Sequence, residues 1–250
     1  MAYSSASPAS TAGRSTTPGA AWSAEAGMPF RLPLWAALLA AFLGGCADTG
    51  VDPATTSASQ AEAAGDGFDF YVLALSWSPS YCAAEGGRAD RRQCGRNGPD
   101  GFVVHGLWPQ KDKGYPANCR SSEPDRVPRQ LLSSVRDLFP TDGLAAHEWR
   151  KHGTCSGLSQ RDYFALTRKA RERVRIPPGI GGGTTSPKEV ENAFIRTNRG
   201  LDPDEIAVAC DGRLMREVRI CLDRSLDFTA CPQVDRAGCR APRLSMPAKQ

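Results

Sequence analysis

Hydrophobic residues follow regular spacings only after about residue 67, where they predict two strands and then a helix. Residues 68–77 are rich in aromatic and β-branched side chains, which predicts a central strand. Residues 102–105 predict a second strand, which we expect to be ended by Gly106 and Pro109. Apolar side chains at positions 131, 132, 135 and 138 have helical spacing, so we expect a helix over residues 130–138 that stops before Pro140.

The remaining pattern predicts three more helices and a hairpin. Residues 144–152 have helical spacing and are followed by Gly153, and residues 161–173 form an amphipathic, basic pattern. Another helix should begin at Ser186, where Ser-Pro-Lys-Glu supplies a cap, a proline in the first turn and a glutamate three residues on. Residues 206–209 and 214–222 flank Asp211-Gly212, a strong hairpin signal. Because strands and helices do not alternate strictly, we expect an α+β fold, an antiparallel sheet flanked by helices.

The first 67 residues have the composition of a targeting segment and its flanks. Residues 1–27 are rich in Ala, Ser, Thr and Gly without periodicity, so we interpret them as disordered or as an over-long gene start before Met28. Arg31, the apolar run 32–43 and the small residues 44–46 predict a signal peptide over 28–46. The apolar run is shorter than the roughly 20 residues that a membrane-spanning helix needs.

The maturation of this segment has two open readings. Leu-Gly-Gly-Cys at 43–46 resembles the lipobox of bacterial lipoproteins, in which the cysteine, here Cys46, is acylated and becomes the mature N-terminus. Ordinary cleavage near residues 45–47 would instead release a soluble product. Residues 47–67 then form a flexible linker to a folded domain over 68–250. The expected location is the periplasm, the outer membrane through a lipid anchor at Cys46, or the medium.

Composition supports a packed, disulfide-stapled domain. Of the 250 residues 40% are hydrophobic and 23% charged, which excludes a fibrous or wholly disordered chain, and a net charge of +4 suits an anionic partner without requiring one. Apart from Cys46 there are eight cysteines, an even number in an exported chain, which predicts disulfides. No Cys-x2-Cys clamp occurs, so structural zinc is disfavoured. The sequence alone does not choose the pairing.

The three histidines lie in two short segments. His105 belongs to Phe-Val-Val-His-Gly-Leu-Trp-Pro, whereas His147 and His152 belong to His-Glu-Trp-Arg-Lys-His-Gly-Thr-Cys. On a helix, Glu148 shares one face with Lys151 and His152. A charged helix face is usually only solvated, but this segment holds both remaining histidines of the chain together with a nearby Trp and Cys, which favours a chemical site.

These residue types suit one reaction. Two imidazoles with pKa values near 6.5 can act as general base and general acid, and a lysine can stabilise charge on phosphoryl oxygens. The sequence contains no Gly-x-Ser-x-Gly elbow, no P-loop and no carboxylate cluster for a metal. The set therefore fits transesterification of a phosphodiester that carries its own nucleophile, which RNA has in its 2′-hydroxyl and DNA lacks. No cofactor or metal is expected.

The two segments resemble the two catalytic signatures of the ribonuclease T2 family, His-Gly-Leu-Trp-Pro and His-Glu-Trp-x-Lys-His-Gly-Thr-Cys. Further similarity lies in Leu-Ser-Trp-Ser-Pro of the first strand, in Tyr-Pro-Ala-Asn-Cys at 115–119 and in the cysteine-containing tail, so the resemblance covers residues 68–247. It implies an α+β fold and a metal-independent endoribonuclease that cleaves single-stranded RNA through a 2′,3′-cyclic phosphate to 3′-phosphate ends. We expect a monomer.

The resemblance also implies roles for individual residues. His105 would be the general acid for the leaving 5′-oxygen and His152 the general base on the 2′-hydroxyl. Glu148 and Lys151 would stabilise the transition state, and His147 would bind the phosphate.

Base binding is expected from aromatic side chains. Trp108 offers a face on which an unstacked base could lie, with core packing as the alternative, and Tyr115 offers a second wall. Gln110 stands where some family members carry an acidic residue that helps to choose the base, which favours a broad preference. Trp149 should face the core.

The family pattern implies a disulfide pairing as well: Cys119–Cys155, Cys210–Cys239 and Cys221–Cys231, with Cys82–Cys94 completing the set. Two other classes of function remain as alternatives. One is a catalytically idle RNA-binding protein on the same fold, and the other is a cell-surface interaction protein without a nucleic-acid role.

Overall fold

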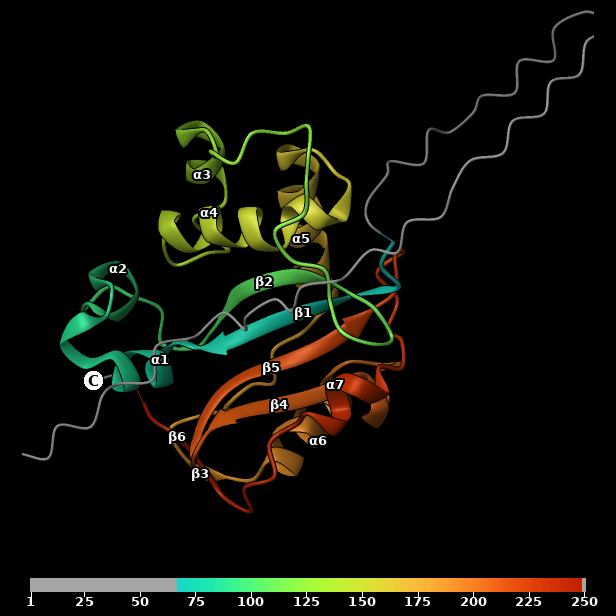
Figure 1. Cartoon of the computed structure of the whole chain (residues 1–250). Coiled ribbons are helices and arrows are strands. Elements are labelled where there is room, and N and C mark those ends of the chain that lie inside the picture. Colours follow the sequence, from blue (N-terminus) through green and yellow to red (C-terminus); the bar gives the residue numbers. More distant parts are fainter. Residues whose placement is uncertain (1–66, 249–250) are drawn as a thin grey trace, which may run out of the picture. The chain divides into compact units, whose positions relative to one another are not determined.

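The computed structural model describes residues 67–248, and the predicted signal peptide over 28–46, with Cys46, lies outside them. These described residues form one six-stranded sheet and a set of helices, as Figure 1 shows. The elements in order are β1 (Phe70–Trp77), α1 (Ser78–Glu85), the 3-10 helix η1 (Gly86–Arg88), α2 (Arg91–Cys94), β2 (Phe102–Gln110), α3 (Arg129–Ser134), α4 (Asp142–Lys151), η2 (Gly153–Ser156), α5 (Gln160–Arg173), β3 (Gly183–Thr185), α6 (Pro187–Thr197), η3 (Pro203–Glu205), β4 (Ile206–Asp211), β5 (Leu214–Leu222), α7 (Pro232–Arg236) and β6 (Leu244–Met246).

The sheet is antiparallel at its centre. Its strand order is β2-β1-β5-β6-β3, with β4 also paired to β5, and the short contact between β5 and β6 is parallel. Helices α3, α4 and α5 gather beside the edge strand β2, whereas α6 and α7 lie along β4 (Figure 1). The expected α+β fold with an antiparallel sheet flanked by helices is therefore confirmed.

The two faces of the central strand differ in what they contact. Tyr71, Leu73, Leu75 and Trp77 point into the main core, where they meet apolar side chains of β2, β5 and the helices. Trp149 of α4 belongs to this core: it is fully buried, and its indole N–H donates to the Pro124 carbonyl at 3.0 Å. The prediction that Trp149 faces the core is confirmed.

The alternate residues of β1 form the other face. Phe70 and Val72 belong to a small second cluster with Cys221, Cys231 and Val234. Farther along the strand this face carries only the small side chains Ala74 and Ser76. The space over Ala74 and Ser76 is therefore available to longer side chains from the neighbouring strands β2 and β5.

Strand β2 is longer than predicted because it contains a bulge. Leu75 lies opposite Val104 and Ala74 opposite Gly106, so His105 is the extra residue. The extra residue shifts the alternation, and Val104 and Leu107 are both buried in the main core although an odd number of positions separates them. The predicted end of the strand at Gly106 and Pro109 was wrong, because both residues continue the pairing with β1, opposite Ala74 and Tyr71.

Two helix boundaries differ from the predictions for local reasons. The helix expected over 130–138 ends at Ser134, because Val135 leaves the helical region at φ −119° and turns its side chain into the core. Helix α4 begins two residues earlier than predicted, because the Thr141 hydroxyl accepts a hydrogen bond from the Leu144 N–H at 3.0 Å. The predicted start at Ser186 and the hairpin around Gly212 are confirmed.

The eight cysteines of the folded region form four disulfides: Cys82–Cys94, Cys119–Cys155, Cys210–Cys239 and Cys221–Cys231. This is the pairing that the family resemblance implies. Within residues 67–248, no helix is long and apolar enough to cross a membrane.

The capping box of α6 allows a direct test of local stability. The Ser186 hydroxyl accepts from the Glu189 N–H at 3.2 Å, and the Glu189 carboxylate accepts from the Ser186 N–H at 2.7 Å. We expect Ser186→Ala to lower the free energy of unfolding by about 1 kcal/mol, measured by urea denaturation with the disulfides intact. Ser134→Ala, at the exposed end of α3, is the control and should change it by less than about 0.5 kcal/mol. Equal midpoints for the two variants would contradict the assigned cap.

Candidate active site

The candidate site forms where α4 passes the edge strand β2. His105, at the bulge of β2, has its Nε2 atom 3.7 Å from Oε1 of Glu148 on α4. On its other side, Nδ1 lies 2.7 Å from Oε2 of Glu217 on β5. The imidazole is 26% exposed, whereas both carboxylates are almost completely buried. Two of the expected catalytic residues are thus brought together, with a third ionisable residue beside them.

Glu148 reaches His105 because the strand beneath it lacks a side chain. The Trp108 indole N–H donates to Oε2 of Glu148 at 2.7 Å. A Cβ atom at Gly106 would lie 2.0 Å from that oxygen and 2.4 Å from the indole nitrogen, so only glycine leaves room for the carboxylate. Burial raises the pKa of Glu148, and the neighbouring His105, Trp108 and Lys151 only partly oppose this.

Glu217 was not predicted as a site residue. It is fully buried, and Arg219 donates to its Oε1 from Nε at 2.9 Å and from Nη2 at 2.8 Å. Burial by itself would raise the pKa of Glu217, but hydrogen bonding to His105, the charge of a protonated His105 and the arginines lower it to about 2. In the sequence, Glu217 and Arg219 alternate with apolar residues and resemble the solvent-facing side of a strand. Only the strand order places them near His105.

The pKa of His105 is raised above its ordinary value. Burial alone would lower it, but the hydrogen bond and charge of Glu217 and the charge of Glu148 favour the protonated imidazole more strongly. His105 is therefore suited to hold a proton near neutral pH.

His152 has the opposite character. It lies just after the last residue of α4, with its N–H donating to the Glu148 carbonyl at 2.9 Å, and its ring is stacked on Trp108 at 5.2 Å between centroids. Burial, followed by the charge of Lys151, lowers the pKa of His152 to about 3. Its Nδ1 atom is buried and has no hydrogen-bond partner among residues 67–248. His152 is therefore neutral at ordinary pH and can accept a proton.

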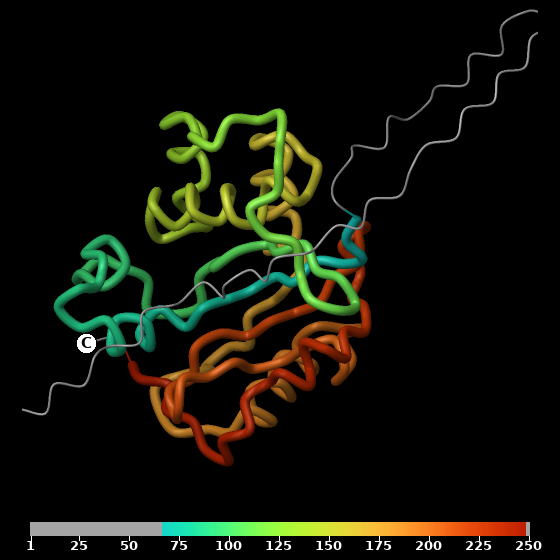
Figure 2. The backbone as a smooth tube through the Cα atoms, viewed as in Figure 1, coloured from blue at the N-terminus to red at the C-terminus, as the bar shows by residue number. Residues whose placement is uncertain are grey.

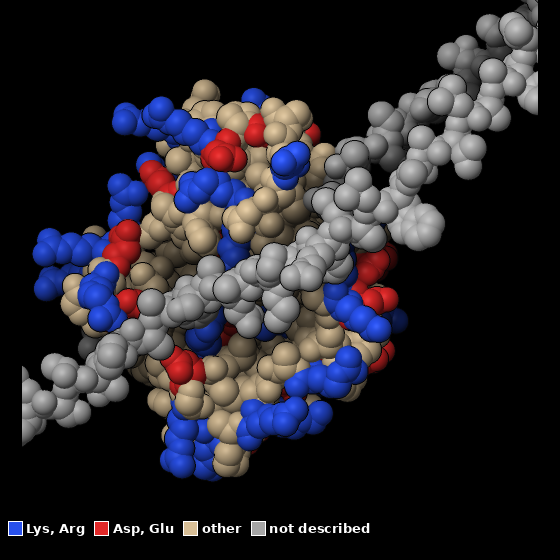
Figure 3. Space-filling view, in the orientation of Figure 1, with Lys and Arg blue, Asp and Glu red and all other residues tan. Residues whose placement is uncertain are grey.

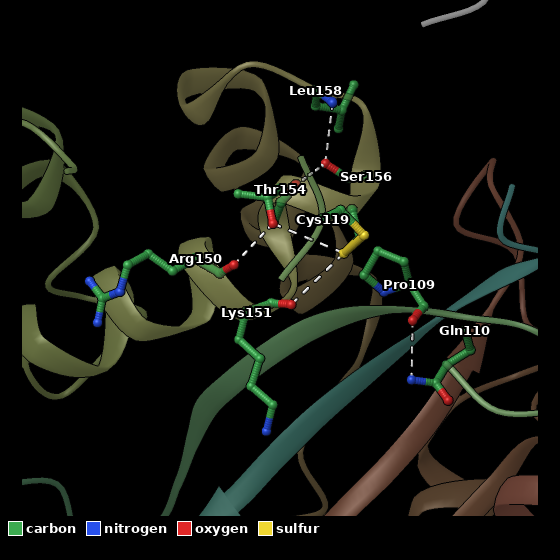
Figure 4. Close-up of a disulfide and its surroundings, with 10 residues drawn as sticks. Pro109, Gln110, Cys119, Arg150, Lys151, Thr154, Ser156 and Leu158 are labelled. Carbon is green, nitrogen blue, oxygen red and sulfur yellow. Dashed lines mark hydrogen bonds between the residues drawn. A yellow bond between two sulfur atoms is a disulfide. The ribbon is translucent and has the colours of Figure 1, made fainter. Parts of the chain in front are cut away.

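Lys151 and His147 complete the charged face of α4. Lys151 is partly exposed and extends from the helix toward the sheet in Figure 4. His147 is largely exposed; the partial burial of its ring and then the charges of Lys151, Arg150 and His105 lower its pKa. The predicted common face of the helix is thus present, although His152 stands one residue beyond the helical end.

The loop after β2 is tied to the end of α4. Figure 2 shows this loop leaving β2 and rising to α3. Cys119 in the loop is bonded to Cys155, three residues after His152 (Figure 4). The Asn118 N–H donates to the Lys151 carbonyl at 2.8 Å. Tyr115 of the same loop is 59% exposed, and its ring lies 6.5 Å from that of His152.

Two residues considered for base binding have partners within the protein. The half-buried Trp108 holds Glu148, stacks on His152 and lies with its ring 5.5 Å from the Arg219 guanidinium. Gln110 is buried, and its amide donates to the Pro109 carbonyl at 3.2 Å, as Figure 4 shows. Tyr115 is the more exposed of the two aromatic candidates.

The surface carries charged side chains of both signs. Lys and Arg side chains, with Asp and Glu among them, are spread over the visible face in Figure 3. In the part of the chain that the structure describes, no group of three His, Cys, Asp or Glu side chains could hold a metal ion.

Comparison with known proteins assigns the family. The family model described as "Ribonuclease T2 family" matches residues 68–231. A ribonuclease of Aeromonas hydrophila is 38% identical over 186 residues, which are 72% of this chain and 83% of that protein. A probable ribonuclease of Haemophilus influenzae is 31% identical over 150 residues, 52% of this chain and 55% of that protein.

A solved structure supports the same assignment. The crystal structure of RNase NT in complex with 5′-AMP has a TM-score of 0.55 at 27% sequence identity, and the likeness covers 73% of this chain and 99% of that one. The family model extends from just before β1 to Cys231 and includes both histidine segments. From this match, and from a fold and a bacterial relative that agree with it, we conclude that the chain belongs to the ribonuclease T2 family.

Proposed function

We propose that this protein, an endoribonuclease of the T2 type, cleaves single-stranded RNA by transesterification through a 2′,3′-cyclic phosphate to 3′-phosphate ends. The proposal depends on one observation above all. His105 and His152 have pKa values shifted in opposite directions, and both rings lie 5.2 Å from the ring of Trp108. Two titratable groups whose pKa values are pushed apart within one site are the usual arrangement for an acid and a base.

The proposed roles follow from the protonation states. Neutral His152 takes the proton of the 2′-hydroxyl, whose oxygen attacks the phosphorus. Protonated His105 gives its proton to the 5′-oxygen as the bond between phosphorus and that oxygen breaks. Water then opens the cyclic phosphate with the two roles exchanged. DNA lacks the 2′-hydroxyl and is not a substrate.

The other residues of α4 act on the phosphoryl group. Lys151 supplies a positive charge for the phosphoryl oxygens in the transition state. Glu148, held by the Trp108 indole N–H and lying beside Nε2 of His105, helps to stabilise the transition state by orienting the protonated imidazole. His147, exposed on the same helix, binds the phosphate. Because one helix carries these groups, their relative positions are set before the substrate binds. No metal or cofactor takes part in this proposal.

Base binding is proposed to occur mainly at Tyr115. Its exposed ring near His152 can stack on an unpaired base, which is worth about 1–3 kcal/mol. Trp108 forms the inner wall, held by Glu148. The amide of Gln110 is bonded within its own strand and is not turned to a base, so the proposed base preference is broad.

We also propose how the chain reaches its place of action. Residues 28–46 direct export, residues 47–67 form a linker, and Cys46 is either the site of lipid attachment or part of an ordinary cleavage site. The four disulfides support export, because they persist in oxidising compartments. The enzyme acts as a monomer, in the periplasm, at the outer membrane or outside the cell.

Product analysis tests the proposed reaction. The oxidised protein is incubated in EDTA with single-stranded RNA and, separately, with the same sequence made of 2′-deoxy sugars. The His105→Ala variant is treated in the same way. The new ends are identified by mass spectrometry. We expect cyclic-phosphate ends from RNA only, and a rate lower by about 10²–10⁴-fold for the variant. Intact RNA from folded, oxidised protein would contradict the proposal and favour an RNA-binding protein without activity.

The pH dependence of kcat/KM tests the two imidazole assignments. With rising pH, activity should first increase as His152 loses its proton, at a pKa of about 3. It should then decrease as His105 loses its proton, at a pKa above the ordinary value for histidine. Because the charge of Lys151 lowers the pKa of His152, Lys151→Gln should move the acidic limb to higher pH in addition to lowering the maximum. The exposed neighbour Arg150 is the matched control, and Arg150→Gln should leave the acidic limb in place. An acidic limb unchanged in Lys151→Gln would refute the assignment of His152.

The disulfide beside the site should matter for activity as well as stability. Removing Cys119–Cys155 by a double substitution to Ala frees the Tyr115 loop from the end of α4, so we expect kcat/KM to fall at least about tenfold. Removing Cys82–Cys94 in the same way is the control, since that bond joins α1 to α2. Each change should destabilise the protein by about 2–4 kcal/mol. Unchanged turnover in the folded Cys119→Ala, Cys155→Ala protein would contradict the link.

A further inference from the structure

Glu217 is a fully buried carboxylate to which the proposed reaction gives no role. Both of its oxygens have defined partners. Oε1 accepts two hydrogen bonds from Arg219, at 2.9 and 2.8 Å, and Oε2 lies 2.7 Å from Nδ1 of His105. The side chain of His105 is the only one of the three that carries a proposed chemical step.

The sheet explains how residues of two separate strands meet. β1 lies between β2 and β5, and its Ala74 is opposite both Gly106 and Arg219. Ser76 of β1 is opposite Glu217. Side chains of directly opposite residues share a face of the sheet, so His105 and Glu217 meet above small side chains of the strand between them. A larger residue at position 74 or 76 would occupy this space.

We infer that Glu217, held by Arg219, is a positioning residue for His105: it fixes a proton at Nδ1 and leaves Nε2, the nitrogen beside Glu148, to deliver the other proton to the 5′-oxygen. This inference rests on the proposed role of His105 as the acid. In neutral imidazole only one nitrogen carries a proton, and an acceptor at 2.7 Å from Nδ1 selects that tautomer. When Nε2 of His105 also carries a proton, the ring is a cation, and the Glu217 carboxylate stabilises its charge.

The geometry of Glu217 is not explained by an ion pair with Arg219 alone. Both hydrogen bonds from Arg219 go to one oxygen, which turns the second oxygen toward His105 rather than toward the arginine. Arg219 itself is fixed by the Trp108 ring, 5.5 Å from its guanidinium. His105 is thereby held from one side through Arg219 and Glu217 and from the other through Trp108 and Glu148.

Several charges act on His105, and their sum decides the effect of removing Glu217. β1 contains no charged side chain. The charged or titratable groups that face the imidazole are Glu217, Arg216 and Arg219 from β5 and His147, Glu148, Lys151 and His152 from α4 or its end. Apart from the two glutamates all of these groups are basic, so loss of Glu217 leaves more positive surroundings that disfavour protonated His105.

The test is Glu217→Gln, which keeps the shape and a hydrogen-bond acceptor but removes the charge. The basic limb of kcat/KM should move to lower pH by at least about one unit, while KM changes little. At pH values above the limb each unit lowers the fraction of protonated His105 about tenfold, so kcat should fall about tenfold or more there. Glu217→Asp, which retains the charge, should keep the limb nearer to its original position.

A second buried carboxylate provides the matched control. Glu205 accepts from the Asp202 N–H at 2.7 Å at the start of η3, and Glu205→Gln should leave both limbs of the pH profile unchanged. A variant that is only destabilised should lose the same proportion of its activity at every pH. If Glu217→Gln behaves in this way and its basic limb does not move, the positioning role is wrong.

NMR titration of His105 separates this inference from the proposed function and needs no variant to fold. In the unchanged protein the ring should titrate above its ordinary pKa, and the neutral form should carry its proton on Nδ1. If these are observed while RNA is not cleaved, the proposed function fails and the pairing stands. A His105 that titrates at or below its ordinary pKa, or a neutral form protonated on Nε2, would overturn the inference.

Discussion

Two buried carboxylates approach opposite nitrogens of one imidazole, and this contact sets demands on much of the surrounding structure. A carboxylate removed from water is strongly destabilising unless hydrogen bonds and opposite charges replace its hydration. Glu217 obtains them from Arg219 and His105, and Glu148 from Trp108 with weaker help from His105. β2, β5 and α4 must therefore be placed correctly together, and an error in any of them would leave a buried charge without a partner.

Several contacts away from the imidazole fix the position of α4 relative to the sheet. Its start is capped by Thr141, its inner side is packed through Trp149 into the main core, and its end is joined to the loop by Asn118 and by the disulfide to Cys119. Gly153, directly after His152, allows the chain to pass close to the core, since a Cβ there would lie 2.4 Å from the Trp149 ring. These contacts are remote from the reacting atoms but fix their relative positions.

The sequence predicts those parts of the site that depend on local order and misses those that depend on strand order. Glu148, Lys151 and His152 lie within one helical turn, so their common face follows from spacing. Their approach to His105 was expected from the family resemblance, and the structure places Glu148 beside it. Glu217 was missed because a glutamate alternating with apolar residues is typical of a solvent-facing strand. Its burial follows from β1 lying between β5 and β2, which no local pattern encodes.

The bulge in β2 has a consequence for how such a site can change over time or be transplanted. His105 and Trp108 are three positions apart, so a regular strand would turn them to opposite sides of the sheet, yet their rings are 5.2 Å apart. Because His105 is itself the extra residue, shortening this segment to a regular strand would remove the imidazole that lies between the two carboxylates. Point substitutions can adjust the chemistry gradually, but the length of this segment is an all-or-none property. A designer who grafted the catalytic side chains onto another sheet would have to transfer the irregular strand together with them.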